Sequence, residues 1–156
     1  MSSPSLYSIA TGSVALSASA TKSLWLLDPV TNGFSIVEFG ISFDGSAAAT
    51  AIRVDLYQVS TIGSPAGTTA TVNKWTDTNI GAATTTGLTA LTAEPTTVAV
   101  LANWFVTPFS GLLEIQYPLG REVGAGAGLT TNRLGLRAVT PSGVSPNCVS
   151  HVIWQE

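Results

Sequence analysis

The stretch that decides the fold reads SIVEFGISF over residues 35–43. Its large apolar side chains recur at every second position, at Val37, Phe39, Ile41 and Phe43. Because alternate side chains of a β-strand point to opposite faces, this period predicts a strand with one dry face and one wet face. Strands of this kind build antiparallel sheets that cover a core on one side only.

The same alternation recurs in three further stretches, residues 51–59, 111–117 and 133–139. The charges in these strands are expected on the wet faces, at Glu38, Arg53, Asp55, Glu114, Arg133 and Arg137. Less regular strands are expected at Leu6–Leu16 with a break near Gly12, at Lys22–Asp28, at Thr97–Thr107 and at Asn147–Gln155. The whole pattern predicts an all-β protein, a jelly-roll-like antiparallel β-sandwich of about eight strands.

The composition supports a single sandwich domain over residues 1–156. Only 10 % of the residues are charged, against about 25 % in an average domain. A disordered chain has many charges and few hydrophobic residues, and a helical bundle needs more Glu, Lys and Leu, so both classes are excluded. A net charge of −3 with six Lys and Arg gives no basic surface for nucleic acid.

Neither a membrane span nor a secretory signal is expected. No apolar run approaches the roughly 18 residues that cross a bilayer, and no basic residue precedes Lys22. The single cysteine, Cys148, has no partner for an internal disulfide and is expected to be a buried strand thiol. We therefore expect synthesis in a cytoplasm.

Two stretches are predicted to be long Thr- and Gly-rich loops, Gly63–Thr92 and Gly120–Thr131. The first carries only two charges, Lys74 and Asp77, so we interpret it as a segment that lies against another protein. The second contains GAGAG at residues 124–128. No βαβ unit follows this motif, so a turn or bulge is favoured over a dinucleotide-binding loop.

The sequence offers no cluster of catalytic or metal-ligating residues. His151 is the only histidine, and its neighbour Ser150 would point to the opposite face of the strand, so the two cannot form a nucleophile–base pair. One His and one Cys are too few ligands for a zinc site. The dispersed acidic residues match neither a calcium loop nor the spacing of a glycosidase pair. No catalytic residue, metal or cofactor is expected, and a structural or interface role is favoured for His151.

The aromatic residues are better candidates for contact with a partner. Trp75 stands in the polar loop, where it could anchor a partner; the alternative is that the loop folds back and Trp75 plugs the end of the sandwich. Trp104 lies within Thr97–Thr107, which is apolar on both faces. That stretch is either covered on both sides or near an interface.

The most distinctive tract is YPLGRE, residues 117–122. It combines a strand end, a proline that stops the ladder, a glycine turn and two vicinal opposite charges. Arg121 and Glu122 cannot pair well with each other, and across a subunit interface such charges set the register. The interface candidates are therefore Trp75, Trp104, Tyr117, Arg121 and Glu122.

This tract is followed by a glycine-rich connection, an RLGLR strand at Arg133–Arg137 and a last strand before Glu156. In these features the chain resembles jelly-roll capsid decoration (cement) and minor virion structural proteins of tailed bacteriophages. The resemblance covers roughly the last 60 residues, and the first part of the chain matches only in composition. It implies a trimer or other symmetric cluster that clamps the major capsid protein on the capsid exterior, after synthesis in the host cytoplasm.

The leading hypothesis is thus a non-enzymatic virion protein that stabilises a capsid, since a surface poor in Lys and Glu packs well against other proteins. The alternative is a carbohydrate- or host-surface-binding jelly-roll module, a fibre head or lectin-like domain, in which Trp75 and Tyr117 stack on sugars. A small cupin-like enzyme is disfavoured because cupins need several histidines.

Overall fold

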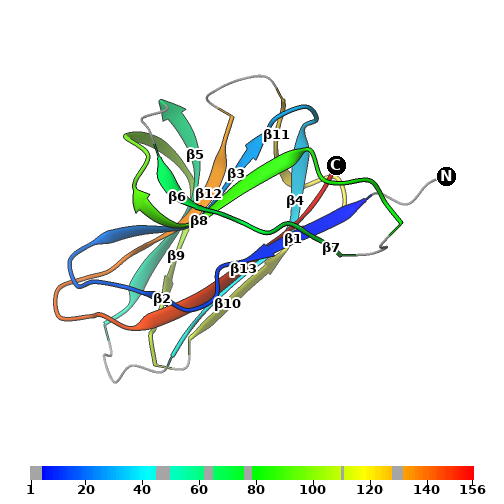
Figure 1. Ribbon diagram of the computed structural model, residues 1–156. Coiled ribbons are helices and arrows are strands. Elements are labelled where there is room, and N and C mark those ends of the chain that lie inside the picture. The colour runs from blue at the N-terminus through cyan, green and yellow to red at the C-terminus, as the bar shows by residue number, and fades with distance from the viewer. Residues whose placement is uncertain (1–4, 45–49, 62–64, 76–78, 110, 128–131) are drawn as a thin grey trace.

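The computed structural model describes residues 5–44, 50–61, 65–75, 79–109, 111–127 and 132–156. These residues form two antiparallel β-sheets packed face to face (Figure 1). The predicted all-β sandwich is confirmed, but it contains 13 strands rather than about eight.

The first sheet has seven strands, and its main path runs β10-β4-β13-β1-β7, with β11 paired to β4 and β2 paired to β13. The strands are β1 (Leu6–Ala10), β2 (Val14–Ala15), β4 (Phe34–Phe43), β7 (Asn73–Lys74), β10 (Leu112–Gln116), β11 (Val123–Ala125) and β13 (Asn147–Gln155).

The second sheet has six strands in the order β6-β8-β3-β12-β5-β9. They are β3 (Thr21–Pro29), β5 (Ile52–Thr61), β6 (Ala66–Thr69), β8 (Thr85–Ala93), β9 (Thr97–Val106) and β12 (Leu134–Val139).

The main core lies between the two sheets and is built from large side chains. Trp25, Phe39 and Trp154 are all fully buried. The Trp25 indole donates a hydrogen bond to the Ser150 hydroxyl at 3.1 Å, and this hydroxyl donates to the Gly40 carbonyl at 2.6 Å. The core therefore contains a satisfied polar chain rather than an isolated hydroxyl.

Cys148 lies in this core as a free, buried thiol, as predicted. Burial, with a smaller contribution from the charge of Asp44, raises its pKa to about 12. The thiol is therefore protonated at neutral pH.

A second, smaller core lies on the opposite face of the six-stranded sheet and consists of Leu26, Tyr57, Val59 and Leu91. The Tyr57 hydroxyl lies 2.8 Å from the Ser23 hydroxyl, and burial raises the pKa of Tyr57. This sheet is therefore partly covered on both faces.

Asp55 corrects one prediction, because it was expected on a wet face and is instead fully buried. Its carboxylate lies 2.9 Å from Nε of Arg53 and 3.0 Å from Nε of Arg137. Arg137 reaches it because the register of β12 on β5 sets the two residues opposite each other. A buried charge persists when it is paired in this way.

Val37 corrects a second prediction. The register between β4 and β13 shifts so that Ile153 faces Glu38 while Trp154 faces Ile36, which makes Val37 the extra residue of a bulge. Ile36 takes the core position and is fully buried, whereas Val37 is half-buried.

The segment Gly63–Thr92 is not the long loop that was predicted. It contains β6, β7 and most of β8. Between β6 and β7 the chain crosses from the six-stranded to the seven-stranded sheet (Figure 1). Four side chains of this segment pack against the main core: Ala70 and Val72 before β7, and Ile80 and Ala83 after it. The segment therefore closes its own sandwich.

The predicted loop Gly120–Thr131 contains β11, and its residues 128–131 lie outside the described part of the chain. Gly124 is the middle residue of β11 and faces Ser35 of β4. A Cβ at this position would lie 2.6 Å from the carbonyl oxygen of Phe34. Glycine is therefore required by close strand contact, and the turn or bulge predicted here is wrong for residues 123–125, which form a strand.

Candidate functional site

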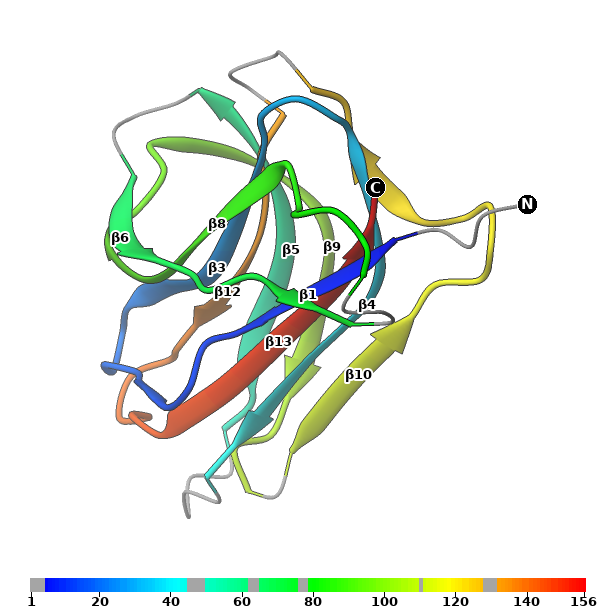
Figure 2. The ribbon, with the colours of Figure 1, turned by 45° about the vertical axis from the view of Figure 1, so that its right-hand side comes forward.

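Two consecutive strands, β9 and β10, each form the edge of a different sheet (Figure 2). Their inward-facing side chains pack on the main core, but each edge strand has a neighbouring strand on one side only, so these side chains are covered from that side alone. They are Trp104 of β9, Leu113 and Ile115 of β10, and Tyr117 just after β10, and all are half-buried. The core is therefore less covered along these two edges than in the middle of the sheets.

Trp104 and Tyr117, two of the predicted interface candidates, meet on one buried ring. Their ring centroids lie 5.6 and 6.2 Å from that of Phe39. Such tilted aromatic contacts stabilise beyond their buried area. Burial also raises the pKa of Tyr117, so its hydroxyl stays protonated at neutral pH. The fold places these two residues together as part of one surface.

Large apolar side chains beside these edges point outward. Phe105, Phe109 and Leu112 are 73 %, 66 % and 64 % exposed. We call these two edges and the turn between them the open side. It includes the side chains that pack inward, Trp104, Leu113, Ile115 and Tyr117, and the exposed ones, Phe105, Phe109 and Leu112. Residues 97–111 contain no Asp, Glu, Lys or Arg. An exposed apolar surface without charge is typical of the centre of a protein interface.

The position of Phe109 follows from the turn between the two strands. A Cβ on Gly111 would lie 1.8 Å from the carbonyl oxygen of Thr107, so only glycine lets the chain fold back this closely. The Gly111 carbonyl then accepts a hydrogen bond from the Phe43 N–H at 3.3 Å. Pro108 is buried beneath this turn, while Phe109 is left on its surface.

The tract 117–122 forms a turn beyond the end of β10. The Arg121 N–H donates to the Pro118 carbonyl at 2.9 Å, and Gly120 has a φ of +83°. The Glu122 carboxylate accepts a hydrogen bond from the Gly120 N–H at 2.7 Å. Glu122 thus holds its own turn, while Arg121 is exposed. Leu119 at the tip is 90 % exposed.

Trp75 is separate from the open side. It follows β7 at the far end of the seven-stranded sheet from β10, and its N–H donates to the Leu6 carbonyl at 2.8 Å. Its side chain is 59 % exposed, so the alternative in which Trp75 plugs the end of the sandwich is wrong. Ile80 and Val72 pack against the core instead.

His151 lies on the outer face of the seven-stranded sheet, while Ser150 points into the core as predicted. The His151 Nε2 is 3.4 Å from a Glu38 oxygen, and Gln116 donates to the other Glu38 oxygen at 3.4 Å. A Cβ on Gly40 would lie 2.5 Å from Cε1 of His151. The imidazole of His151 therefore covers Gly40, beside a hollow of about 250 Å³.

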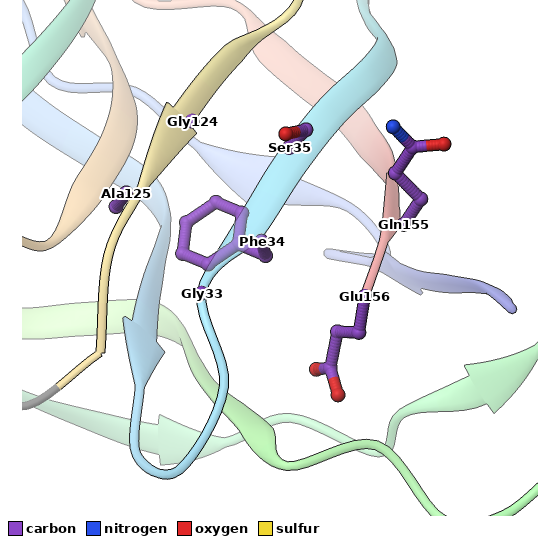
Figure 3. A pocket seen from close by; sticks show the side chains of 7 residues that line it. All are labelled: Gly33, Phe34, Ser35, Gly124, Ala125, Gln155 and Glu156. Carbon is purple, nitrogen blue, oxygen red and sulfur yellow. The ribbon is translucent and has the colours of Figure 1, made fainter. Parts of the chain in front are cut away.

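A larger hollow of about 510 Å³ lies between β4, β11 and the end of β13 (Figure 3). Its polar side chains are those of Ser35, Gln155 and Glu156. The Glu156 carboxylate accepts hydrogen bonds from the Thr84 N–H at 2.9 Å and the Thr85 N–H at 2.7 Å. This carboxylate is therefore already bound within the chain.

Glu156 has a lowered pKa. Partial burial on its own would raise the pKa, but the hydrogen bonds from the backbone N–H groups of Thr84 and Thr85 and from the Thr84 hydroxyl outweigh it. These bonds favour the charged form. The carboxylate thus acts as an anchor for the start of β8.

In the described ranges, no group of three or more His, Cys, Asp or Glu lies close enough to hold a metal ion. Among the same residues, none belongs to a helix long and apolar enough to cross a membrane.

Comparison with models of protein families gives no match, and comparison with curated proteins gives none either. The fold and surface define the class of this chain only as an antiparallel β-sandwich with one exposed apolar side.

Sequence reasoning identified Trp104 and Tyr117 but missed Phe105, Phe109 and Leu112 as members of the same surface. The available signal was the run of fifteen uncharged residues, 97–111, with apolar side chains on both faces of a strand. Such a strand at the edge of a sheet exposes one of its apolar faces.

Proposed function

We propose that this chain is a non-enzymatic structural protein of a bacteriophage virion, which decorates the capsid exterior and stabilises it through symmetric protein–protein contacts. The observation that carries the proposal is the open side, an exposed apolar surface along two sheet edges, where residues 97–111 carry no charge. The likeness of residues 117–122 and 133–137 to phage decoration proteins supports the choice of partner, the major capsid protein.

The size of the surface suits an assembly held by repetition. The exposed parts of Phe105, Phe109 and Leu112 amount to about 400 Å² of apolar area. Burial of that area contributes on the order of 10 kcal/mol before costs, while association itself costs about 4–15 kcal/mol. One contact is therefore weak, and many contacts repeated by symmetry give firm attachment.

The test adds purified protein to phage capsids that lack it and measures co-sedimentation and the temperature of capsid melting. The protein is expected to bind at micromolar concentration and to raise the melting temperature. The double variant Phe105→Ser/Phe109→Ser should lose at least ten-fold in affinity. Val30→Ser, a change at an exposed apolar residue away from the open side, serves as the matched control. No binding at micromolar concentration would overturn the proposal.

A second candidate is a module that binds carbohydrate or a host surface, and the exposed ring of Trp75 favours it. Exposed aromatic rings can stack on sugars, but Tyr117 packs on Phe39, which leaves Trp75 as the available platform of the two that were predicted. A glycan array distinguishes the candidates. Binding that is lost in Trp75→Ala would favour this function over capsid decoration.

A further inference from the structure

The edge strands of the two sheets differ in how well they are protected. Within the described residues, β6, β7 and β10 at the sheet ends have four, two and five residues, and β10 carries Glu114 at its centre. β9 has ten residues and contains neither a charge nor a proline. Natural sheets guard their edges with short strands, charges or prolines, because an open edge templates pairing with another strand. By this standard the part of β9 beyond the register shift at Leu101, residues 102–106, is the unguarded edge.

β9 pairs with β5 along one side, and no other described strand pairs with it. Its register on β5 shifts at Leu101, and from Ala102 to Val106 the pairing is regular. This half of the strand carries Trp104 on the inner face and Phe105 on the outer face. It therefore offers both an ordered ladder edge and exposed aromatic surface to a partner.

We infer that the partner of this edge is a second copy of the chain, whose β9 pairs antiparallel with the first across a two-fold axis near Trp104. The inference rests on the proposed function in one respect, namely that the open side is an assembly surface. It assigns the β9 edge of that surface to contacts between neighbouring copies, and it leaves Leu112 and the β10 edge for the capsid protein.

Charge is the main argument for a second copy. A two-fold contact brings each residue near its own copy, so any charge close to the axis meets a like charge. Residues 97–111 carry no charge, so β9 itself and the following turn bring no like charges together. The nearest charge, Arg53 opposite Phe105 on β5, is already paired with Asp55. In an antiparallel pair of identical strands, the two partners also have the same length and the same pattern of hydrogen-bonding groups.

The area is sufficient but modest. Pairing along β9 would also cover parts of Phe105 and Phe109, which are exposed in each copy. Specific interfaces start at about 1,000–1,200 Å², so the paired backbones of β9 must supply the area that these aromatic side chains do not. We therefore expect a dissociation constant on the order of 10 µM, with monomers at low concentration and dimers at high concentration.

The test measures the mass of the free protein by sedimentation equilibrium from about 1 to 500 µM, a range that spans the expected constant. Wild type is expected to change from one 16.0 kDa chain to two. Phe105→Glu brings the negative charges of the two copies close to the axis, because the neighbouring Arg53 on β5 is already paired with Asp55, and it should weaken the dimer at least ten-fold. Val30→Glu makes the same change at a residue that is 57 % exposed and should leave the dimer unchanged.

Hydrogen exchange of the wild-type protein provides a second measurement that needs no variant. The outward amides of β9 should exchange more slowly at 500 µM than at 1 µM, while those of β6 should not change. A protein that stays monomeric, a trimer, or a dimer with unprotected β9 amides would each overturn the inference. If β9 is protected only on capsids, a strand of the capsid protein occupies the edge; the inference then fails while the proposed function stands.

Discussion

The two lateral sides of this sandwich are completed in different ways. On one side, the chain between β6 and β8 crosses from sheet to sheet and packs Val72 and Ile80 onto the core. Hydrogen bonds fasten this closed side, since the Tyr7 hydroxyl donates to the Gly81 carbonyl at 3.0 Å and Glu156 binds the start of β8.

The other side has no comparable cover among the described residues. There β9 and β10 leave Trp104 and Tyr117 half-buried over Phe39, with Phe105 exposed beside them. A low charge content therefore does not by itself mark an interaction surface. The segment 63–92 is nearly uncharged and contacts its own core, whereas the uncharged edge β9 faces outward.

The largest effect is expected beneath the open side, in Phe39→Ala. Phe39 is fully buried and contacts Trp25, Trp104 and Tyr117. Loss of the ring should reduce the free energy of unfolding by about 3–5 kcal/mol, as measured by urea titration. A loss below about 1 kcal/mol would mean that the aromatic cluster is not part of the stable core.

The next effect is expected on the closed side, in Glu156→Gln. The neutral amide loses the charge-assisted hydrogen bonds from Thr84 and Thr85, which should cost about 2 kcal/mol of unfolding free energy. Because Glu156 is remote from β9, the self-association of the variant should equal that of wild type. A changed dimer constant would show that the two sides are coupled.

Acid should remove the stabilisation that the Glu156 carboxylate contributes. The pKa of Glu156 is lower in the folded protein than its ordinary value of 4.5, so the stabilisation is fully present above that value. It is lost as the pH falls through the lowered pKa. Unfolding measured between pH 7 and pH 2.5 should therefore show a smaller loss for Glu156→Gln than for wild type, and parallel curves would contradict the role of this carboxylate.

The smallest effect on stability is expected at the surface of the open side, in Phe109→Ser. The side chain is 66 % exposed, so the free energy of unfolding should change by less than about 0.5 kcal/mol. Capsid binding should nevertheless weaken by several-fold. A variant that loses stability instead of binding would place Phe109 in the core and not on an interaction surface.

The sequence correctly predicted which side chains of a strand point to the core where the two-residue period is undisturbed. In β5, Ile52, Val54 and Leu56 lie in the core, on the face away from the charges expected to be wet, and in β13 Cys148 is buried as expected. Predictions failed where distant parts of the chain decide the outcome. Asp55 is buried because Arg137 comes from a strand 82 residues later, and no local pattern contains that pairing.

The short strands β6 and β7 were missed for a different reason. Their sequences, AGTT and NK, contain no large apolar side chains, so they show no period for a strand prediction to detect. The open side was found only in part, since Trp104 and Tyr117 were chosen separately as aromatics. Only the order of strands reveals that β9 and β10 are both edges.

The most direct test of the open side as an assembly surface is hydroxyl-radical footprinting of the protein, free and bound to capsids. Protection on the capsid is expected at Phe105, Phe109 and Leu112, while the oxidation of Val30 and Trp75 stays unchanged. Protection at Trp75 with unchanged oxidation of Phe105 and Phe109 would contradict this assignment and place the contact at the opposite edge of the sandwich.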